Sequence, residues 1–527
     1  MTSRRARTRL AVLAALSIVL VVGAALVWAW PRDDDRSAPG PSGSPAATAD
    51  GRPSIHLTPS AHWMNDPQRP VFVDGRWHLY YLYNADHPHG NGTAWYHVSS
   101  TDLVHWRDEG VAIEKYRNGL GDIWTGSVVV DEHGTAGFGA GALVALVTQQ
   151  DDGVQRQSLF FSTDGGASFA SYDGNPVMDN PGVDAWRDPK VIWDEQRGRW
   201  LMLLAEGDKI GFYTSPDLKE WTYRSGFERD DLGVLECPDL FEMTAEDGSR
   251  HWVLGVSANG EAHGRTTGYA YWTGSFDGEV FAPDEDDPLW LDGGADFYAG
   301  VTWSDPRDGA ASMRRYALGW MNNWAYAGSL PTAGWQGGAL SIVRELRLRE
   351  QDRRLALTSE PIDAIGALEG APISASGIRI VEGETAVDGI PQPAEGAFRL
   401  RMTIAQDPRD PADEVRVRVG DESAFATVGA DFAQGAVFLA RDADLAADAM
   451  PEQYGAVRTA RAPLADGRVE FDVVVDAISI EAFAEGGIAS LTGLVFLDPA
   501  ARAIAVESVG GDVIVEDVSV ASLSSTR

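Results

Sequence analysis

The chain has 527 residues and a formal net charge of −35, from 78 acidic and 43 basic side chains. This charge excludes nucleic acid and anionic membrane surfaces as partners, because both would repel the chain. The chain is longer than a domain with a single hydrophobic core usually is, so we expect two folded domains and a tail. Strand-type residues and turn signals dominate, which predicts an all-β fold.

The first 53 residues predict a targeting segment and a spacer. Four arginines at positions 4 to 9 precede an uncharged apolar run at 10–30, which is typical of an export signal. The run could also span a bilayer as a helix, so residues 1–30 are a signal peptide or a signal anchor. Residues 31–53 predict a disordered linker. We therefore expect an extracellular protein, secreted or anchored to the outer face of the cytoplasmic membrane through residues 10–30 only.

Residues 54–350 predict a five-bladed β-propeller, because two sequence markers recur there at the same uneven spacing. Periods of 48 to 64 residues with about four short strands each are typical of propeller blades. Turns of the form Ser-x-Asp recur at Asp102, Asp164, Asp217 and Asp277, and we expect the first three of these Asp side chains to cap loop amides. The phrases that open the segments are WMNDPQRP, DIWTGS, WRDPKV, LECPDLF and ADFYAG, which contain Asp66, Trp124, Asp188, Glu236 and Asp296.

Three of these phrases supply carboxylates that the repeat predicts to converge. The innermost strand of each blade borders the central channel, so residues at matching positions in successive repeats face one another. On this basis Asp66, Asp188 and Glu236 should meet at one place. Carboxylates that lie close together are typical of enzymes that hydrolyse glycosidic bonds.

The other metal-binding and nucleophilic candidates are weak. The only cysteine, Cys237, cannot form an intramolecular disulfide, and we expect it to be a small buried residue lining the pocket beside Glu236 rather than a nucleophile. The acidic run at 284–287 has no calcium-loop spacing and predicts a solvated turn. We therefore expect no metal and no cofactor.

The pattern changes after residue 350. A charged connector is expected at 351–366, and alternating apolar runs predict a β-sandwich at 367–527. Catalytic phrases are scarce in this second domain, so we assign it to support or to carbohydrate contact.

The propeller and the sandwich together resemble glycoside hydrolase family 32, the fructan hydrolases and invertases. The similarity rests on the three acidic phrases, the WTGS stretch at 124–127, the turn at 99–106 and the stretch at 319–346. It implies that Asp66 is the nucleophile, Asp188 the transition-state stabiliser and Glu236 the general acid/base of a retaining reaction through a covalent fructosyl-enzyme. Glu236 must start protonated, which crowding by two neighbouring carboxylates would favour.

The pocket for one fructosyl unit is expected to be polar and aromatic. A propeller also uses Trp to pack its blades, so each Trp candidate could equally lie in the core. The candidate binding residues are Asn65, Trp63, Gln68, Trp95, Trp124, Ser127, Arg187, Cys237, Asp296 and Trp320.

Two departures from the family pattern bear on the substrate. Gln68 and Arg69 stand where many members have Asn-Gly, and Leu82 replaces a Gln that helps to bind sucrose-like or inulin-like substrates. The chain thus resembles the levan-directed branch, and the expected substrate is fructan, above all β-2,6-linked levan. The alternatives are a levan fructotransferase that forms a difructose dianhydride and, outside enzymes, a sugar-binding propeller.

Overall fold

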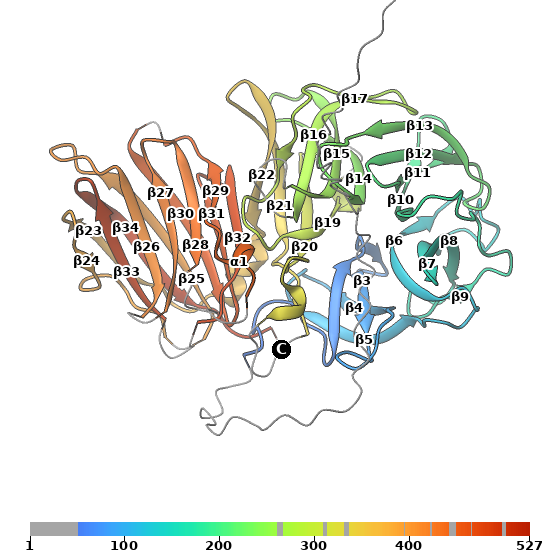
Figure 1. Cartoon of the computed structure of the whole chain (residues 1–527), viewed down its shortest axis with the longest axis horizontal. Coiled ribbons are helices and arrows are strands. Elements are labelled where there is room, and N and C mark those ends of the chain that lie inside the picture. The colour runs from blue at the N-terminus through green and yellow to red at the C-terminus, as the bar shows by residue number, and fades with distance from the viewer. Residues whose placement is uncertain are drawn as a thin grey trace, which may run out of the picture. The chain divides into compact units, whose positions relative to one another are not determined.

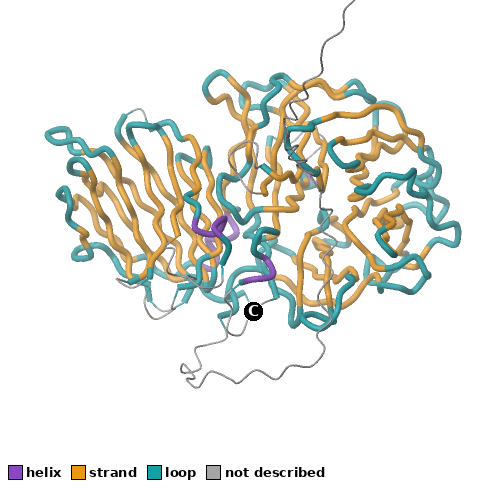
Figure 2. The backbone as a smooth tube through the Cα atoms, in the orientation of Figure 1, coloured by secondary structure: helices purple, strands orange, loops and turns teal. Residues whose placement is uncertain are grey.

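The computed structural model describes residues 51–526 apart from 261–266, 309–312, 331–336, 395, 422–423, 442–449, 465 and 498–501. The described residues form seven β-sheets joined by loops and very short helices (Figures 1 and 2). The predicted export segment and most of the spacer lie outside these residues. Within the described ranges, no helix has the length and apolar character that crossing a membrane requires.

Five of the described sheets are antiparallel propeller blades, each with its first strand innermost (Figure 1). The first is β1 (Trp63–Pro67), β2 (Val71–Val73), β3 (Arg76–Asn84), β4 (Ala94–Ser100) and β5 (Trp106–Ile113). The second is β6 (Asp122–Asp131), β7 (Ala142–Asp151), β8 (Val154–Ser162) and β9 (Ala170–Ser171). The third is β10 (Arg187–Asp194), β11 (Arg199–Ala205), β12 (Lys209–Ser215) and β13 (Thr222–Glu228).

The fourth blade is β14 (Leu235–Thr244), β15 (Arg250–Asn259), β16 (Thr267–Phe276), β17 (Phe281–Pro283) and β18 (Leu289–Trp290). The fifth is β19 (Tyr298–Trp303), β20 (Arg314–Trp320), β21 (Arg344–Gln351) and β22 (Arg354–Pro361). Three short 3-10 helices, η2 (Pro306–Asp308), η3 (Ala327–Ser329) and η4 (Asp363–Leu368), lie in and after this blade.

Apolar clusters between neighbouring blades close the ring. Tyr80 and Trp95 of the first blade pack against Phe160 of the second, and Met64 of the first blade packs with Trp303 of the fifth. The innermost strands contact one another in turn from β6 through β10 and β14 to β19, and β19 contacts β1. The prediction of a five-bladed propeller is confirmed.

The Ser-x-Asp turns cap loop amides, as expected. Asp102 accepts hydrogen bonds from the backbone amides of Val104 (3.0 Å) and His105 (2.8 Å), and Asp217 accepts equivalent bonds from Lys219 and Glu220. These bonds favour the ionised carboxylate and lower the pKa of Asp102 to about 2, even though partial burial opposes them. Their role is structural.

The end of the propeller differs from the prediction. Strand β22 lies within the expected connector 351–366 but pairs with β21 as the outer strand of the fifth blade. The hairpin turn is the two residues Asp352 and Arg353, whose φ angles are 49° and 66°. Two left-handed residues between paired strands make a tight turn that matches the twist of the strands. In the sequence, the two charged residues of this turn had suggested a linker.

The other two described sheets form the predicted sandwich, each with six strands. The first runs β23 (Ile373–Ile380), β34 (Val513–Ser522), β25 (Phe398–Gln406), β30 (Arg468–Asp476), β31 (Ser479–Ala484) and β32 (Ala489–Leu494). The second runs β24 (Thr385–Ala386), β33 (Ala503–Val509), β26 (Glu414–Gly420), β27 (Phe425–Asp431), β28 (Ala436–Arg441) and β29 (Arg458–Arg461), with helix α1 (Glu452–Gly455) between β28 and β29. Side chains from both sheets fill one apolar core.

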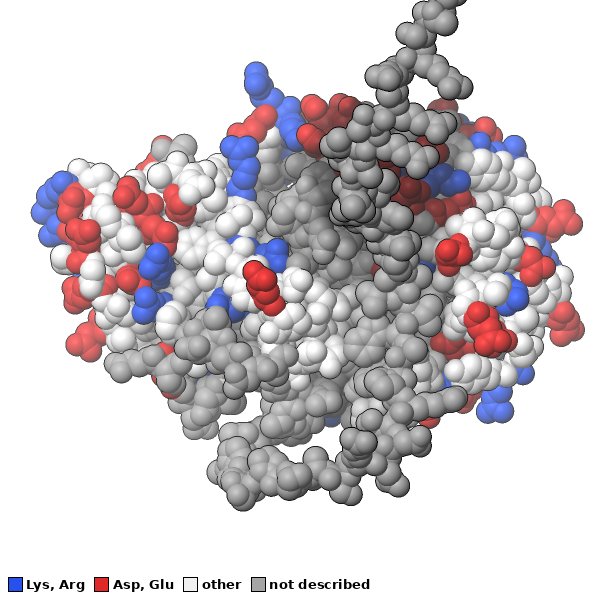
Figure 3. Space-filling view, in the orientation of Figure 1, with Lys and Arg blue, Asp and Glu red and all other residues white. Residues whose placement is uncertain are grey.

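Buried charges connect the sandwich to the propeller. Arg344 on β21 pairs with Asp292 (2.7 Å) and with Glu481 of β31 (2.5 Å), and all three side chains are inaccessible to solvent. His56 lies between Asp476 and Glu481, with each of its ring nitrogens 2.8 Å from one carboxylate. On the face shown in Figure 3, by contrast, the acidic side chains are spread over the outer surface.

His56 makes stability depend on pH. Burial lowers its pKa, but hydrogen bonds and charges from Asp476 and Glu481 outweigh burial and raise it to about 9. Protonated His56 therefore stabilises the fold fully below its ordinary value of 6.5, and this contribution is lost as pH rises through about 9. We expect the free energy of unfolding to fall across this window by roughly 1.4 kcal/mol per pH unit from this group.

Denaturant unfolding at several pH values would measure this slope. The variant His56→Gln should lose stability and flatten the curve between pH 6.5 and 9, whereas the exposed control His105→Gln should keep the wild-type slope. Parallel curves for wild type and His56→Gln over this window would contradict the assignment.

Candidate active site

The innermost strand of every blade contains one extra residue. A β-bulge of this kind breaks the alternation of side chains and re-aims the bulged residue, and bulges are common next to active sites. The extra residues fall on the phrases that open the sequence repeats. The pairing register shifts between Asn65 and Pro67, Ile123 and Gly126, Arg187 and Lys190, Glu236 and Asp239, and Tyr298 and Val301.

These bulges define which residues of different blades are equivalent. Asp66 and Asp188 occupy the first bulged position of their strands, and Cys237 occupies it in the fourth blade. Asp188 and Cys237 both have left-handed backbones, with φ of 64° and 47°. Glu236 stands one residue earlier, at the position of Arg187. The equivalence inferred from the sequence is therefore wrong by one residue in the fourth blade.

In the fifth blade the equivalence is wrong by three residues, because the first bulged position is Ala299. Tyr298, the last paired residue before the bulge, matches Glu236, whereas the expected Asp296 precedes the strand. The side chain of Asp296 is buried in an ion pair with Arg441 of the sandwich (2.9 Å). It joins the two domains, which corrects the prediction that it binds substrate.

Asp66 is held by donors from its own blade and the next. Thr125 Oγ1 donates to Asp66 Oδ2 (2.6 Å), and Asn65 Nδ2 donates to Oδ1 (3.1 Å). Trp63 Nε1 in turn donates to Asn65 Oδ1 (3.3 Å), which fixes the amide orientation. Neutral donors of this kind stabilise an ionised carboxylate without removing its charge.

Asp188 lies on the other side of Cys237. The backbone amide of Cys237 donates to Asp188 Oδ2 (2.9 Å), and the Cys237 sulfur is 3.7 Å from that oxygen and 4.0 Å from Asp66 Oδ2. Thr148 Oγ1 accepts a hydrogen bond from the backbone amide of Asp188 (2.9 Å). The small thiol thus fills the space between the two carboxylates, as expected for Cys237.

Glu236 completes the group of carboxylates. Arg187 Nε and Nη2 lie 3.0 Å and 2.9 Å from Glu236 Oε1, and Arg187 Nε is also 4.0 Å from Asp188 Oδ2. The hydroxyl of Tyr298 donates to Glu236 Oε2. The structure therefore brings Asp66, Asp188 and Glu236 together, as the repeat predicted, and adds Tyr298 and Thr125, which sequence reasoning missed.

Burial and mutual repulsion set the electrostatics of this group. Burial raises the pKa of Asp66, and the Glu236 charge adds to the rise while the bond from Thr125 opposes it. Burial also raises the pKa of Asp188, with Arg187 opposing and the charges of Glu236 and Asp66 adding to the rise. Burial raises the pKa of Cys237 well above its ordinary value, so the thiol stays protonated and is not a nucleophile.

Protein-family models match both domains of this chain. The model of the glycosyl hydrolases family 32 N-terminal domain matches residues 56–361, and the model of the family 32 C-terminal domain matches residues 375–522. The chain belongs to glycosyl hydrolase family 32.

Relatives and solved structures agree with the family. The chain is 44% identical to the levanbiose-producing levanase of Bacillus subtilis over 89% of this chain and 90% of that protein. It is 56% identical to the levanbiose-producing levanase of Geobacillus stearothermophilus over 58% of this chain and 78% of that protein. The exo-inulinase of Aspergillus awamori has a similar structure, with a TM-score of 0.81 and 27% identity over 91% of this chain and 99% of that one.

In this family 32 enzyme an aromatic wall adjoins the carboxylates. Trp63 contacts the ring of His87 (centroids 5.2 Å apart) and the edge of Trp320 (5.9 Å). Trp320 is fully buried and packs against Trp324 (4.6 Å), which is 44% exposed. Trp63 and Trp324 therefore offer accessible ring surface, whereas Trp320 supports them from behind. Sequence reasoning named Trp320 and missed Trp324 four residues later.

Three predicted binding residues pack the family 32 propeller instead. Trp95 is fully buried, and its Nε1 donates to the Trp124 carbonyl (2.9 Å). Ser127 is buried and bridges to the third blade through the Pro189 carbonyl (2.8 Å). Gln68 is fully buried: its Nε2 donates to the Asp66 carbonyl (2.9 Å), and its Oε1 accepts from the Gly126 amide (2.9 Å). These residues position their neighbours and have no surface for a sugar.

Trp124 keeps some exposed surface and is oriented by a carboxylate. Its Nε1 donates to Asp122 Oδ2 (3.0 Å), beside the amide of Thr93 that bonds the same oxygen. The neighbouring Thr125 reaches Asp66 directly. Asn65, Trp63, Trp124 and Arg187 thus remain candidate substrate contacts.

Within the described part of the chain, no group of three or more His, Cys, Asp or Glu side chains is arranged to hold a metal ion.

A buried cluster of charged side chains lies on the innermost strands. Lys190 pairs with Asp239 (2.9 Å), whose other oxygen accepts from Thr302 Oγ1 (2.6 Å). Burial, together with the charges of Arg69 and Arg315, lowers the pKa of Lys190 to about 7 against the opposing charge of Asp239. Arg69, a departure from the family pattern, thus belongs to a buried structural cluster.

Proposed function

We propose that this family 32 enzyme hydrolyses levan, the β-2,6-linked fructan, through a covalent fructosyl-enzyme with retention of configuration. The observation that carries the proposal is the meeting of Asp66, Asp188 and Glu236 around Cys237 and Arg187. Two levanases at 44% and 56% identity support levan as the substrate.

In this mechanism Asp66 attacks the anomeric carbon and forms the fructosyl ester. The attacking group must be ionised, and the bonds from Thr125 and Asn65 favour the ionised form against burial. The donors also fix the direction of the carboxylate, so little motion is needed before attack.

Glu236 gives its proton to the leaving oxygen and later, as a carboxylate, removes a proton from the attacking water. Arg187 and Tyr298 bind one oxygen each and hold the carboxyl group in place in both steps. Asp188, with Cys237 and Arg187 beside it, accepts bonds from ring hydroxyls that tighten as positive charge develops on the sugar.

The products of levan degradation test the proposal. By similarity to the two levanbiose-producing relatives, we expect levanbiose as the main early product when purified protein is incubated with levan and the products are separated. Free fructose alone would indicate release of single units. A non-reducing cyclic disaccharide would favour the fructotransferase, and unchanged levan would refute the proposed function.

We also propose that residues 10–30 direct export, so that the enzyme meets polymeric levan outside the cytoplasm. The four arginines before an uncharged apolar run support this placement. Fractionation of cells producing the full chain would test it: enzyme in the medium indicates a cleaved signal, enzyme in the membrane fraction an anchor, and enzyme in the cytoplasm contradicts export.

Removing the hydroxyl of Tyr298 tests its contact with Glu236. In Tyr298→Phe the carboxylate loses one donor, so we expect kcat for levan to fall about tenfold to a hundredfold, as for other bonds to charged groups. The initial rate of sugar release from levan measures the effect. Tyr80→Phe, which removes a buried hydroxyl of the first blade that donates to the Gly166 carbonyl of the second, should leave kcat unchanged. An unaltered kcat in Tyr298→Phe would contradict the role.

A further inference from the structure

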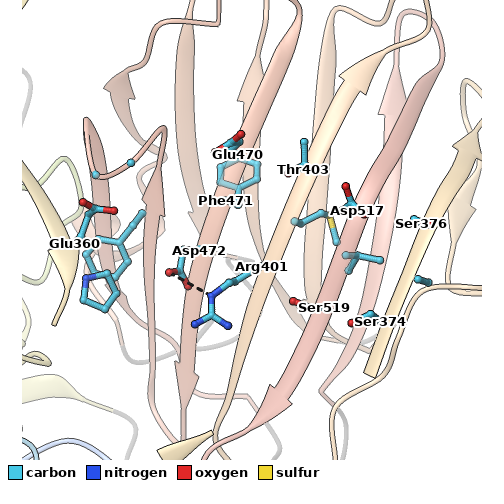
Figure 4. A pocket seen from close by; sticks show the side chains of 17 residues that line it. Glu360, Ser374, Ser376, Arg401, Thr403, Glu470, Phe471, Asp472, Asp517 and Ser519 are labelled. Carbon is cyan, nitrogen blue, oxygen red and sulfur yellow. Dashed lines mark ion pairs between the residues drawn. The ribbon is translucent and has the colours of Figure 1, made fainter. Parts of the chain in front are cut away.

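A cavity lies on the sandwich, outside the group of catalytic carboxylates. It has a volume of about 570 Å³, within the usual range of small-molecule sites. Residues of β23, β34, β25 and β30 line it, together with Glu360 and Pro361 of β22 and with Gly486 and Gly487. Figure 4 shows the labelled side chains of these four strands, with Glu360 at one end. We call this cavity the sandwich groove.

Strand pairing arranges the floor of the sandwich groove in two rows of polar side chains. Directly opposite residues on neighbouring strands share one face of a sheet. The first row is Ser374, Ser519, Arg401 and Asp472, and the second is Ser376, Asp517, Thr403 and Glu470. Neighbouring strands are about 4.8 Å apart, so each row extends roughly 14 Å across the sheet, which is the reach of a short oligosaccharide.

The first row ends where the sandwich meets the propeller. Phe483 lies opposite Asp472 and is buried in the same apolar cluster as Trp303 and Leu318 of the fifth blade. The sheet face is therefore apolar where it packs on the propeller and polar in the groove. The polar rows form the part of this face that the propeller leaves uncovered.

The polar groups of the sandwich groove are held in fixed positions. Arg401 binds both oxygens of Glu369 (3.0 Å and 2.5 Å), and its Nε is 3.8 Å from Asp472, as the dashed line in Figure 4 marks. Asp472 is also bound by Arg399 Nε (2.7 Å). A ligand would meet groups that are already ordered, which lowers the entropy cost of binding.

The charges of the sandwich groove select the class of ligand. Four carboxylates line it, from Glu360, Glu470, Asp472 and Asp517, together with the guanidinium of Arg401. Arg399 and Arg401 pair with Glu369 and Asp472, and Arg468 pairs with Glu470, so the acidic groups here still outnumber the basic ones. An anionic ligand would be repelled. A neutral polyhydroxyl chain can donate its hydroxyls to the carboxylates and accept bonds from the serine and threonine hydroxyls.

We propose that the sandwich groove binds a stretch of the fructan chain remote from the unit being cleaved. The inference rests on the proposed function, since it takes polymeric levan as the substrate. Binding at a second site on the same molecule raises the concentration of chain ends near Asp66. It favours long chains over short ones, because only a long chain can reach both places.

The test compares polymeric levan with levantriose in a double variant, Glu470→Ala with Asp517→Ala. Both side chains are exposed, so the fold should tolerate their loss. Two lost acceptors should raise KM for levan on the order of tenfold, with kcat for levan and both constants for levantriose unchanged. The matched control is Glu384→Ala with Asp388→Ala, which removes the same two charges from exposed positions outside the groove and should behave as wild type.

A blocking variant provides an independent check. Ser519→Lys places a long cation in the middle of the first row, and it should raise KM for levan in the same direction. Unchanged KM for levan in both the double and the blocking variants would overturn the proposal, as would an equal rise for levantriose. Wild-type protein that degrades neither substrate would refute the proposed function instead, so the two failures are distinguishable.

Discussion

Replacing Asp66 by Asn is expected to lower kcat for levan by about 10⁴-fold or more, the usual effect of losing a catalytic nucleophile. Asn keeps the shape of the side chain and its contact with Thr125, but an amide does not form a stable ester with the anomeric carbon. The initial rate of sugar release from levan by the purified variant measures the effect.

The same variant should be more stable than the wild type. Burial and the Glu236 charge raise the pKa of Asp66, so at neutral pH its ionised form is disfavoured by folding. Removing that charge should raise the thermal unfolding temperature while activity is lost, a trade-off common at active sites. The control Asp102→Asn removes a loop cap and should have the opposite pattern, with lower stability and normal kcat. More than a tenth of wild-type turnover in Asp66→Asn would refute the nucleophile assignment.

Replacing Glu236 by Ala should separate the two chemical steps. We expect kcat/KM for levan to fall about 10³-fold, the typical contribution of general acid–base catalysis. A fructosyl fluoride should be affected far less in the first step, because fluoride leaves without a proton. The second step should then limit turnover, and added azide should accelerate it by attacking the fructosyl-enzyme without needing a general base.

Product analysis completes this test. Inversion at each of the two steps gives net retention, which predicts a fructosyl azide with the β configuration of the substrate. Glu242→Ala, a matched change on the same strand β14 at a residue bound to Arg250, should leave rates and azide response at wild-type values. An equal loss for levan and the fluoride, with no azide effect, would mean that Glu236 is not the acid/base.

The architecture was predictable because the blades repeat. Uneven but matching spacings of two markers indicated five four-stranded units, and alternating apolar runs indicated the sandwich. The boundary at residue 350 failed because the charged pair Asp352 and Arg353 forms a hairpin turn, which requires left-handed backbone at both residues. Nothing in the composition of that pair distinguishes a turn from a linker.

The catalytic carboxylates were predictable, and several of their partners were not. Asp66, Asp188 and Glu236 stand in phrases distinctive enough to align, but the bulges shift the alignment by one residue in the fourth blade and by three in the fifth. Aligning the phrases by the Pro or Gly that follows the first bulged residue, at Pro67, Pro189, Pro238 and Gly300, would have matched Tyr298 of the fifth blade to Glu236. The sequence also did not distinguish buried residues from residues that face the site. Gln68 and Trp95 were predicted to bind substrate, but their side chains lie in the packed interior.

The bulges also separate the chemistry of the enzyme from the stability of its blades. A bulged residue such as Asp66 or Cys237 has no partner across the strand ladder, so exchanging its side chain leaves the neighbouring pairs intact. Deleting it would join residues, such as Asn65 and Pro67, whose partners Leu82 and Tyr81 are adjacent on the next strand, so the pairs on both sides would keep their partners and their faces. Innermost strands of this kind can therefore acquire new reactions by substitution at the bulge, because the strand pairing on either side does not depend on that side chain.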